Sequence, residues 1–162
     1  FLLAIKPLKF YNDNPEVITF PTAIFGTFFI IGIITDRALY HSLVFDGFRH
    51  QFGWIMILIG LVLYGWASKQ FFKATTHIRV RKPAVTIVTK GPYKFSRNPM
   101  YIAATMVYAG LSLTFGKLIT LVFLIPCLVV LHYGVIVREE EYLKGKFGDK
   151  YLKYQSKVRR WI

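Results

Sequence analysis

The sequence contains almost no cysteine and few acidic residues. Its 162 residues include one cysteine, Cys127, so a disulfide within the chain is excluded. Charged residues make up 18% of the chain, against roughly a quarter in soluble globular proteins. Because 21 lysines and arginines face only 8 acidic residues, the net charge is +13. Such a charge requires an acidic partner or surface, either nucleic acid or the anionic cytoplasmic leaflet of a membrane.

Hydrophobic residues make up 54% of the chain and are gathered in blocks, with the charges between them. A helix needs about 20 mostly apolar residues to cross a bilayer. Four blocks come close to this length, at residues 17–35, 52–68, 99–115 and 118–137. We therefore expect an all-α integral membrane protein with about four spans, in a single domain over residues 1–162. Only Gly116 and Lys117 separate the third and fourth spans, which predicts a helical hairpin.

The charges between the blocks predict an orientation. Residues 69–98 carry eight lysines and arginines and no acid, whereas the charges of residues 36–51 cancel. The positive-inside rule places the 69–98 loop and both termini in the cytosol, which agrees with an even number of spans. The membrane would be a prokaryotic cytoplasmic membrane or a eukaryotic endomembrane. The attached spans favour the lipid bilayer over nucleic acid as the partner of the basic residues.

The segment of residues 90–101 combines a turn signal with a helix start. Gly91-Pro92 is a turn signal, and Asn98-Pro99 predicts a helix start with the asparagine side chain as cap. Arg97 would then lie beside a helix N-terminus, where backbone N–H groups favour anions. The structural alternative is that Arg97 reaches lipid phosphate and Tyr101 belongs to the aromatic belt of the membrane interface.

Acidic residues follow the fourth block directly, at Glu139 to Glu141. Helical spacing places Glu139 seven residues after His132, on nearly the same face, and an ionisable group within an apolar block is a candidate functional residue. The alternatives are a solvated helix turn for the acids and an interhelical hydrogen bond for His132. The rest of residues 138–160 alternates aromatic and basic residues, which predicts an amphipathic helix at the membrane interface.

These two segments together resemble the isoprenylcysteine carboxyl methyltransferase family, within the wider group that includes phospholipid N-methyltransferases. Members carry Gly-Pro-Tyr-x-x-x-Arg-His-Pro-x-Tyr before a helical hairpin, then Glu-Glu, then Phe-Gly-x-x-Tyr-x-x-Tyr. The matching residues here are Gly91 to Tyr93, Arg97 to Tyr101, Glu139 and Glu140, and Phe147 to Tyr154. One departure matters, because Asn98 stands where the family usually has histidine, and asparagine cannot act as a base near neutral pH.

The resemblance implies an S-adenosylmethionine-dependent methyltransferase, with S-adenosylhomocysteine as product and no need for a metal. The implied cofactor-binding residues are Gly91, Pro92, Tyr93, Arg97, Pro99, Tyr101, Glu139 and Glu140. His132 joins them as a candidate because it is ionisable and lies within an apolar block. Arg97, Asn98 and Glu140 are the implied catalytic residues. The residues themselves fit such a ligand, because Arg97 can hold its carboxylate and the glutamates can hold its amino group or ribose hydroxyls.

The acceptor of the methyl group is expected to be embedded in the membrane or hydrophobic. An isoprenylcysteine-like carboxylate, a lipid amine and a small thiol or alcohol all remain candidates. Asn98 favours an acceptor that is already anionic, or solvent as the proton sink. Two other function classes also remain open. One is a non-catalytic assembly or lipid-binding protein that keeps the fold, and the other is a membrane reductase, a class that need not carry a Gly-x-Gly-x-x-Gly segment.

Overall fold

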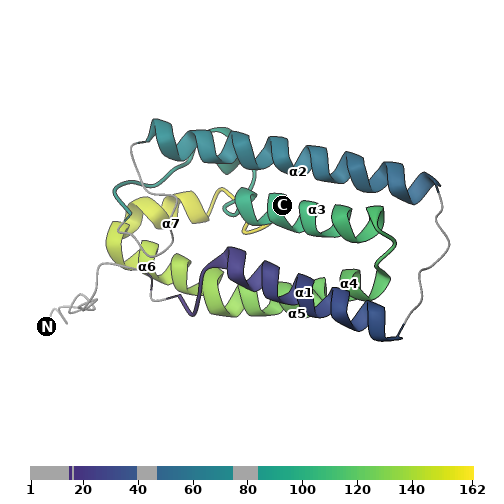
Figure 1. Cartoon of the computed structure of the whole chain (residues 1–162). Helices are drawn as coiled ribbons and strands as arrows, with labels where there is room; N and C mark the ends of the chain where they lie inside the picture. Colours follow the sequence, from purple (N-terminus) through teal and green to yellow (C-terminus); the bar gives the residue numbers. More distant parts are fainter. Residues whose placement is uncertain (1–14, 16, 40–46, 75–83) are drawn as a thin grey trace, which may run out of the picture.

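The structure, a computed structural model, describes residue 15 and residues 17–39, 47–74 and 84–162. Residues 75–83 of the predicted basic loop and most of the segment before residue 17 lie outside this part. The elements in chain order are α1 (Pro21–Leu39), α2 (Gly47–Lys73), the 3-10 helix η1 (Gly91–Lys94), α3 (Pro99–Thr114), α4 (Leu118–Val122), α5 (Leu124–Leu131), the π-helix η2 (His132–Ile136), α6 (Val137–Phe147) and α7 (Asp149–Gln155). Figure 1 shows the long helices side by side, with α6 and α7 at one end.

The predicted all-α class is confirmed, and the described residues contain no strand beyond one isolated bridge between Ser96 and Arg159. Within the described ranges, three helices are long and apolar enough to cross a membrane: α1, α2 and the helix from Leu118 to Phe147. The third predicted span forms α3, whose 16 residues give a length of about 24 Å. This is shorter than the roughly 30 Å of the hydrocarbon core, so the count of four spans stays a prediction.

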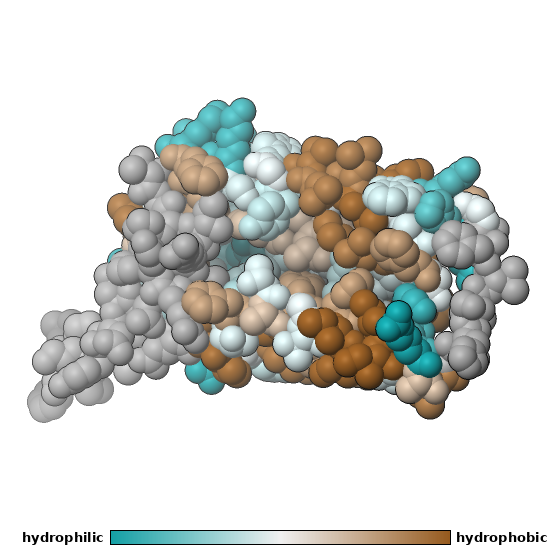
Figure 2. Space-filling view, in the orientation of Figure 1, coloured by the Kyte–Doolittle hydropathy of each residue, from teal (hydrophilic) through white to brown (hydrophobic). Residues whose placement is uncertain are grey.

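The outer faces of the spanning helices are apolar. Ile30 and Ile34 of α1, Leu58 and Val62 of α2 and Ile125 of α5 are each between 59% and 66% exposed. Figure 2 shows hydrophobic side chains over the middle of α1 and α2 and hydrophilic ones toward their ends. A contiguous apolar surface of this kind is incompatible with water, whereas lipid tails solvate it.

Glycine allows α2 and α3 to pack backbone to backbone. Gly53 and Gly60 lie seven residues apart on the face of α2 that meets α3. A Cβ atom on Gly53 would stand 2.7 Å from the Gly110 carbonyl oxygen, and one on Gly110 would stand 2.7 Å from the Gly53 carbonyl oxygen. Since lipid supplies no hydrophobic drive for helix association, close packing through small residues is the main source of this contact.

Proline and a π turn shape the helix from Leu118 to Phe147. Pro126 has no N–H for the carbonyl of Val122 and its ring crowds that carbonyl, which explains the break between α4 and α5 at Phe123. The helix continues past the predicted span end at residue 137, through η2 into α6, and stops where Gly148 takes a φ of +49°. This left-handed conformation suits glycine and lets α7 fold back toward the start of α3 (Figure 1).

A buried carboxylate ties α1 to α4 at the other end of the bundle. Asp36 is 4% exposed and accepts hydrogen bonds from the backbone N–H and the hydroxyl of Thr120. Thr120 lies in the first turn of α4, where backbone N–H groups lack helical partners. Gly32 makes the approach possible, since a Cβ atom there would lie 2.7 Å from the Thr120 Cα.

The glycine contact predicts a position-specific loss of stability. Gly53→Ala should destabilise the protein by about 1–3 kcal/mol, because the added methyl group meets the backbone of α3. Gly65→Ala is the matched control on the same helix, since nothing lies within 4 Å of a Cβ atom at Gly65. Thermal unfolding in detergent measures both. Equal midpoints for the two variants would contradict this packing.

Candidate functional site

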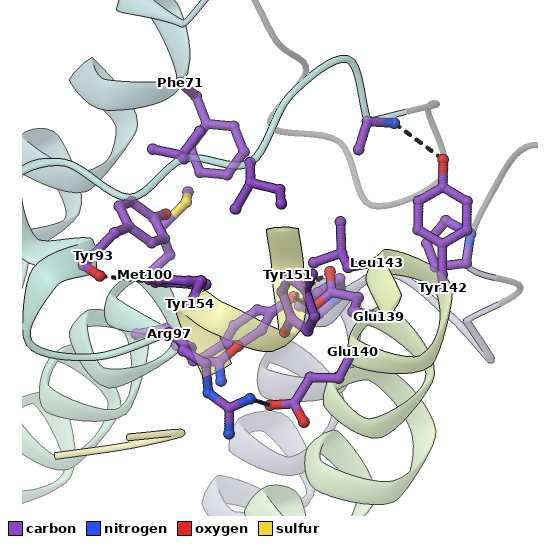
Figure 3. Close-up of a pocket in the computed structure, with 18 of the residues that line it drawn as sticks. Phe71, Tyr93, Arg97, Met100, Glu139, Glu140, Tyr142, Leu143, Tyr151 and Tyr154 are labelled. Atoms are coloured by element: carbon purple, nitrogen blue, oxygen red, sulfur yellow. Dashed lines mark hydrogen bonds and ion pairs between the residues drawn. The ribbon is translucent and has the colours of Figure 1, made fainter. Parts of the chain in front are cut away.

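A cavity of about 430 Å³ lies at the end of the bundle where α3 begins and α6 follows the last span. Figure 3 shows aromatic side chains around it, with Arg97 and Glu140 at one edge. Its polar lining comes mainly from residues 93–101 and from α6 and α7: Tyr93, Arg97, Asn98, Tyr101, Glu139, Glu140, Tyr142, Tyr151 and Tyr154. Its apolar wall includes Phe20, Pro21 and Phe25 near the start of α1, Tyr64 and Phe71 of α2, and Ile87 and Val88.

The Gly91–Lys94 turn fixes the loop beside the cavity. Gly91 has a φ of +62° and packs so closely on Gln70 that a Cβ atom would lie 2.9 Å from that side chain. Tyr93 is buried, its ring meets Phe71 edge to face at 5.5 Å, and its carbonyl accepts the Tyr154 hydroxyl at 2.8 Å. The turn is thereby held by α2 on one side and by α7 on the other.

An ion cluster joins the two motifs. Glu140 is 4% exposed and accepts hydrogen bonds from Arg160, through Nε at 3.0 Å and Nη2 at 2.8 Å. Arg97 Nη1 lies 3.3 Å from Oε1 of the same carboxylate. The hydrogen bonds to the Glu140 carboxylate raise the pKa of the Arg160 guanidinium still further. Two arginines therefore share one anion.

Arg97 keeps unused donors in this cluster. Its side chain is only 9% exposed and lines the cavity. Within the described part of the chain, neither Nε nor Nη1 has a hydrogen-bond partner, because the 3.3 Å approach to Glu140 lacks hydrogen-bond geometry. A buried guanidinium in this state is costly unless an acceptor reaches it. The arrangement suits a ligand carboxylate or phosphate.

Glu139 occupies a different environment from its neighbour. The Tyr101 hydroxyl lies 3.0 Å from both carboxylate oxygens of Glu139. No arginine or lysine among the described residues forms an ion pair with Glu139, and its side chain lines the cavity. The adjacent glutamates thus have different partners. Glu140 is held by arginines, whereas Glu139 lines the cavity and can accept a hydrogen bond from a ligand ammonium or hydroxyl group.

Two tyrosines of α7, Tyr151 and Tyr154, line the cavity. Burial is the main cause that raises the pKa of Tyr151 to about 12, and the Glu140 carboxylate raises it further. Burial likewise raises the pKa of Tyr154, which stands beside Tyr151 with ring centroids 6.1 Å apart. Both phenols are therefore neutral at physiological pH. The Tyr154 hydroxyl donates to the Tyr93 carbonyl, and the Tyr151 hydroxyl can donate to a ligand.

The predicted helix start, with Asn98 at the N-cap position and Pro99 at the first helical position, is confirmed, but the Asn98 side chain does not cap α3. Asn98 Nδ2 instead donates to the Arg160 carbonyl at 3.0 Å, and the Asn98 backbone N–H donates to the Ser96 hydroxyl at 3.0 Å. The competing acceptor is the C-terminal segment, which the sequence pattern did not place beside residue 98.

The predicted site residues separate into two groups. Tyr93, Arg97, Asn98, Tyr101, Glu139 and Glu140 line the cavity, whereas Gly91, Pro92, Pro99 and His132 do not. The first three of these shape the backbone around it. The fourth, His132, lies in the π turn, with Nε2 3.2 Å from Arg160 Nη1. Sequence reasoning missed Arg160, because no motif or spacing marks it.

Comparison with known sequences decides the family. The sequence profile described as phospholipid methyltransferase matches residues 48–150, well over half of the chain. The chain belongs to the phospholipid methyltransferase family. A relative from Haemophilus influenzae, named only as an uncharacterized protein, is 36% identical over 63 residues. The match covers 39% of this chain and the whole of that relative.

The ion cluster predicts a contrast between adjacent glutamates. Glu140→Gln should destabilise the protein by about 3 kcal/mol, because two arginines lose the anion that neutralises them. Glu141→Gln is the matched control, since Glu141 is exposed on the same helix turn. Thermal unfolding in detergent compares the two variants. Equal unfolding midpoints for Glu140→Gln and Glu141→Gln would contradict a stabilising role for the ion cluster.

Proposed function

We propose that the protein is an S-adenosylmethionine-dependent methyltransferase that acts on a hydrophobic or membrane-embedded acceptor. Membership of the phospholipid methyltransferase family suggests membrane methyltransferase activity. The observation that carries the cofactor assignment is Arg97, whose Nε and Nη1 atoms are buried at the cavity edge without a hydrogen-bond partner in the described part of the chain. The cavity volume of about 430 Å³ lies within the range of roughly 300–1,000 Å³ that is usual for small-molecule sites.

The donor set fits this cofactor. S-adenosylmethionine carries a carboxylate, an ammonium group, ribose hydroxyls and a flat aromatic base. Arg97 would hold the carboxylate through a charge-assisted pair, and Glu139 would accept from the ammonium group or the ribose. Tyr93, Tyr151 and Tyr154 supply aromatic surface for the base. Glu140 would act mainly through the arginines that it neutralises.

The bound cofactor would supply a methyl group already activated by its sulfonium, which passes to the acceptor by in-line displacement. The protein then contributes positioning and exclusion of water. Asn98 is not placed to move a proton, because its side-chain N–H donates to the Arg160 carbonyl. An acceptor that carries a proton would have to release it to Glu139 or to solvent, whereas a carboxylate acceptor has none to lose.

The apolar wall favours an acceptor that enters from the membrane. Pro21 and Phe25 lie at the beginning of α1, a candidate span, and Phe20 directly precedes it; all three line the same cavity as the charged residues. A soluble cofactor and a lipid-soluble acceptor could thus meet at one site. We place this end of the bundle on the cytosolic side, because the positive-inside rule favours it.

Arg97 gives the sharpest test of the cofactor assignment. Arg97→Ala should weaken binding of S-adenosylhomocysteine by about 2–5 kcal/mol, because a buried charge pair is lost. Lys94→Ala removes the same charge from an exposed side chain three residues earlier and should change the binding free energy by under about 1 kcal/mol. Calorimetry on detergent-purified protein measures both affinities. Failure of the folded wild-type protein to bind would count against the proposed function as a whole.

The acceptor class can be read from the product. Membranes containing the protein, incubated with methyl-labelled S-adenosylmethionine, should gain label that partitions into organic solvent. Mild base releases the label as methanol from a methyl ester but not from a methylated amine, thiol or alcohol. Label that stays only in water-soluble products would contradict a hydrophobic acceptor. Membranes containing the Arg97→Ala protein supply the background.

A further inference from the structure

Residues 159 and 160 contact the loop that borders the cavity. Arg97 donates its backbone N–H to the Arg159 carbonyl at 3.0 Å. The Arg160 carbonyl accepts from the Ser96 hydroxyl at 3.3 Å and from Asn98 Nδ2 at 3.0 Å. Trp161 packs against the buried cluster that includes Ile24 and Leu131. The C-terminal segment is therefore fixed against the loop that carries Arg97.

The Arg160 side chain reaches from this segment to the end of the spanning helix. Its Nε and Nη2 hold one carboxylate oxygen of Glu140 each, at 3.0 and 2.8 Å. Its Nη1 lies 3.2 Å from Nε2 of His132. Arg160 is 34% exposed along its side chain and does not line the cavity. It can act on a ligand only through the residues that it holds.

Two arginines compete for the Glu140 carboxylate, and Arg160 has the better geometry. A carboxylate held by two N–H donors of one guanidinium keeps about two of its four lone-pair sites, and its orientation is fixed by the guanidinium that holds it. Arg97 accordingly approaches to 3.3 Å without a hydrogen bond and retains its Nε and Nη1 donors. If Arg160 were absent, Glu140 could turn to Arg97, occupy those donors and cancel their charge.

We propose that Arg160 is a positioning residue that keeps Arg97 available for the carboxylate of the bound cofactor. This inference rests on the proposed function. It gives the basic C-terminal segment a defined role in ligand binding, and it explains why Asn98 is directed at the Arg160 carbonyl rather than at α3. Asn98 and Ser96 hold the backbone of residue 160 in the position from which its guanidinium reaches Glu140.

Two ligands separate this role from simple structural support. S-adenosylhomocysteine carries the carboxylate, whereas its decarboxylated analogue, S-adenosyl-3-thiopropylamine, lacks only that group. Calorimetry measures both ligands against the full-length wild type, Arg160→Ala, Arg160→Lys and Lys157→Ala. Lys157 is exposed in the same segment, so its variant matches the charge change. Thermal unfolding accompanies each measurement.

The expected result is selective. Arg160→Ala should weaken S-adenosylhomocysteine binding about tenfold and leave binding of the decarboxylated analogue near the wild-type value. The affinity of Arg160→Lys for S-adenosylhomocysteine should lie between those of the wild type and Arg160→Ala, because one ammonium cannot engage both carboxylate oxygens as a guanidinium does. Lys157→Ala should match the wild type with both ligands. On an Arg97→Ala background, Arg160→Ala should have no further effect on S-adenosylhomocysteine.

Other outcomes overturn the inference. An equal loss of affinity for both ligands would show that Arg160 only supports the fold. A loss of affinity that parallels the fall in the unfolding midpoint would show the same. Unchanged affinity in both Arg160 variants would show that Arg97 needs no such help. If Arg160→Ala does not fold, Arg160→Lys with the two ligands decides the question in the same way. Absence of binding to the wild type would instead defeat the proposed function.

Discussion

One buried carboxylate connects three distant parts of this chain. Glu140 lies near the C-terminal end of the candidate spanning helix from Leu118 to Phe147, Arg97 precedes α3, and Arg160 lies in the C-terminal segment. A buried acid without partners would be strongly unfavourable, so the three segments must come together for the helix to place Glu140 there. The cavity, the unused donors of Arg97 and the exposure of Glu139 to the cavity all depend on this meeting.

The rest of the bundle supports that meeting. Close packing of α2 on α3 through glycine fixes α3, and the hydrogen bonds from Thr120 to the Asp36 carboxylate fix α1 against α4. Because α3 and the following helix run in opposite directions (Figure 1), the start of one and the end of the other lie at the same end of the molecule. Binding chemistry thereby gathers at one end, and the apolar faces remain available to lipid.

The sequence predicted the helical class and most of the cavity's polar residues, because both leave local signals. Apolar blocks mark spans, and the motif residues Tyr93, Arg97, Tyr101, Glu139 and Glu140 all line one cavity. It did not predict the cap geometry of Asn98, since a local propensity cannot reveal a competing acceptor 62 residues away. Arg160 was missed for the same reason, as one arginine among many basic residues in the tail. The helix boundaries also differed, because α6 continues the last span without a local stop signal before Gly148.

Photochemical crosslinking can establish whether this cavity binds S-adenosylmethionine. The detergent-purified protein would be irradiated with labelled S-adenosylmethionine and digested, and the labelled peptides identified by mass spectrometry. If the cofactor binds in the cavity, label should appear on peptides that contain residues 93–104 or 139–154, and excess S-adenosylhomocysteine should abolish it. Label confined to other segments, or label that persists with excess S-adenosylhomocysteine, would contradict binding in the cavity.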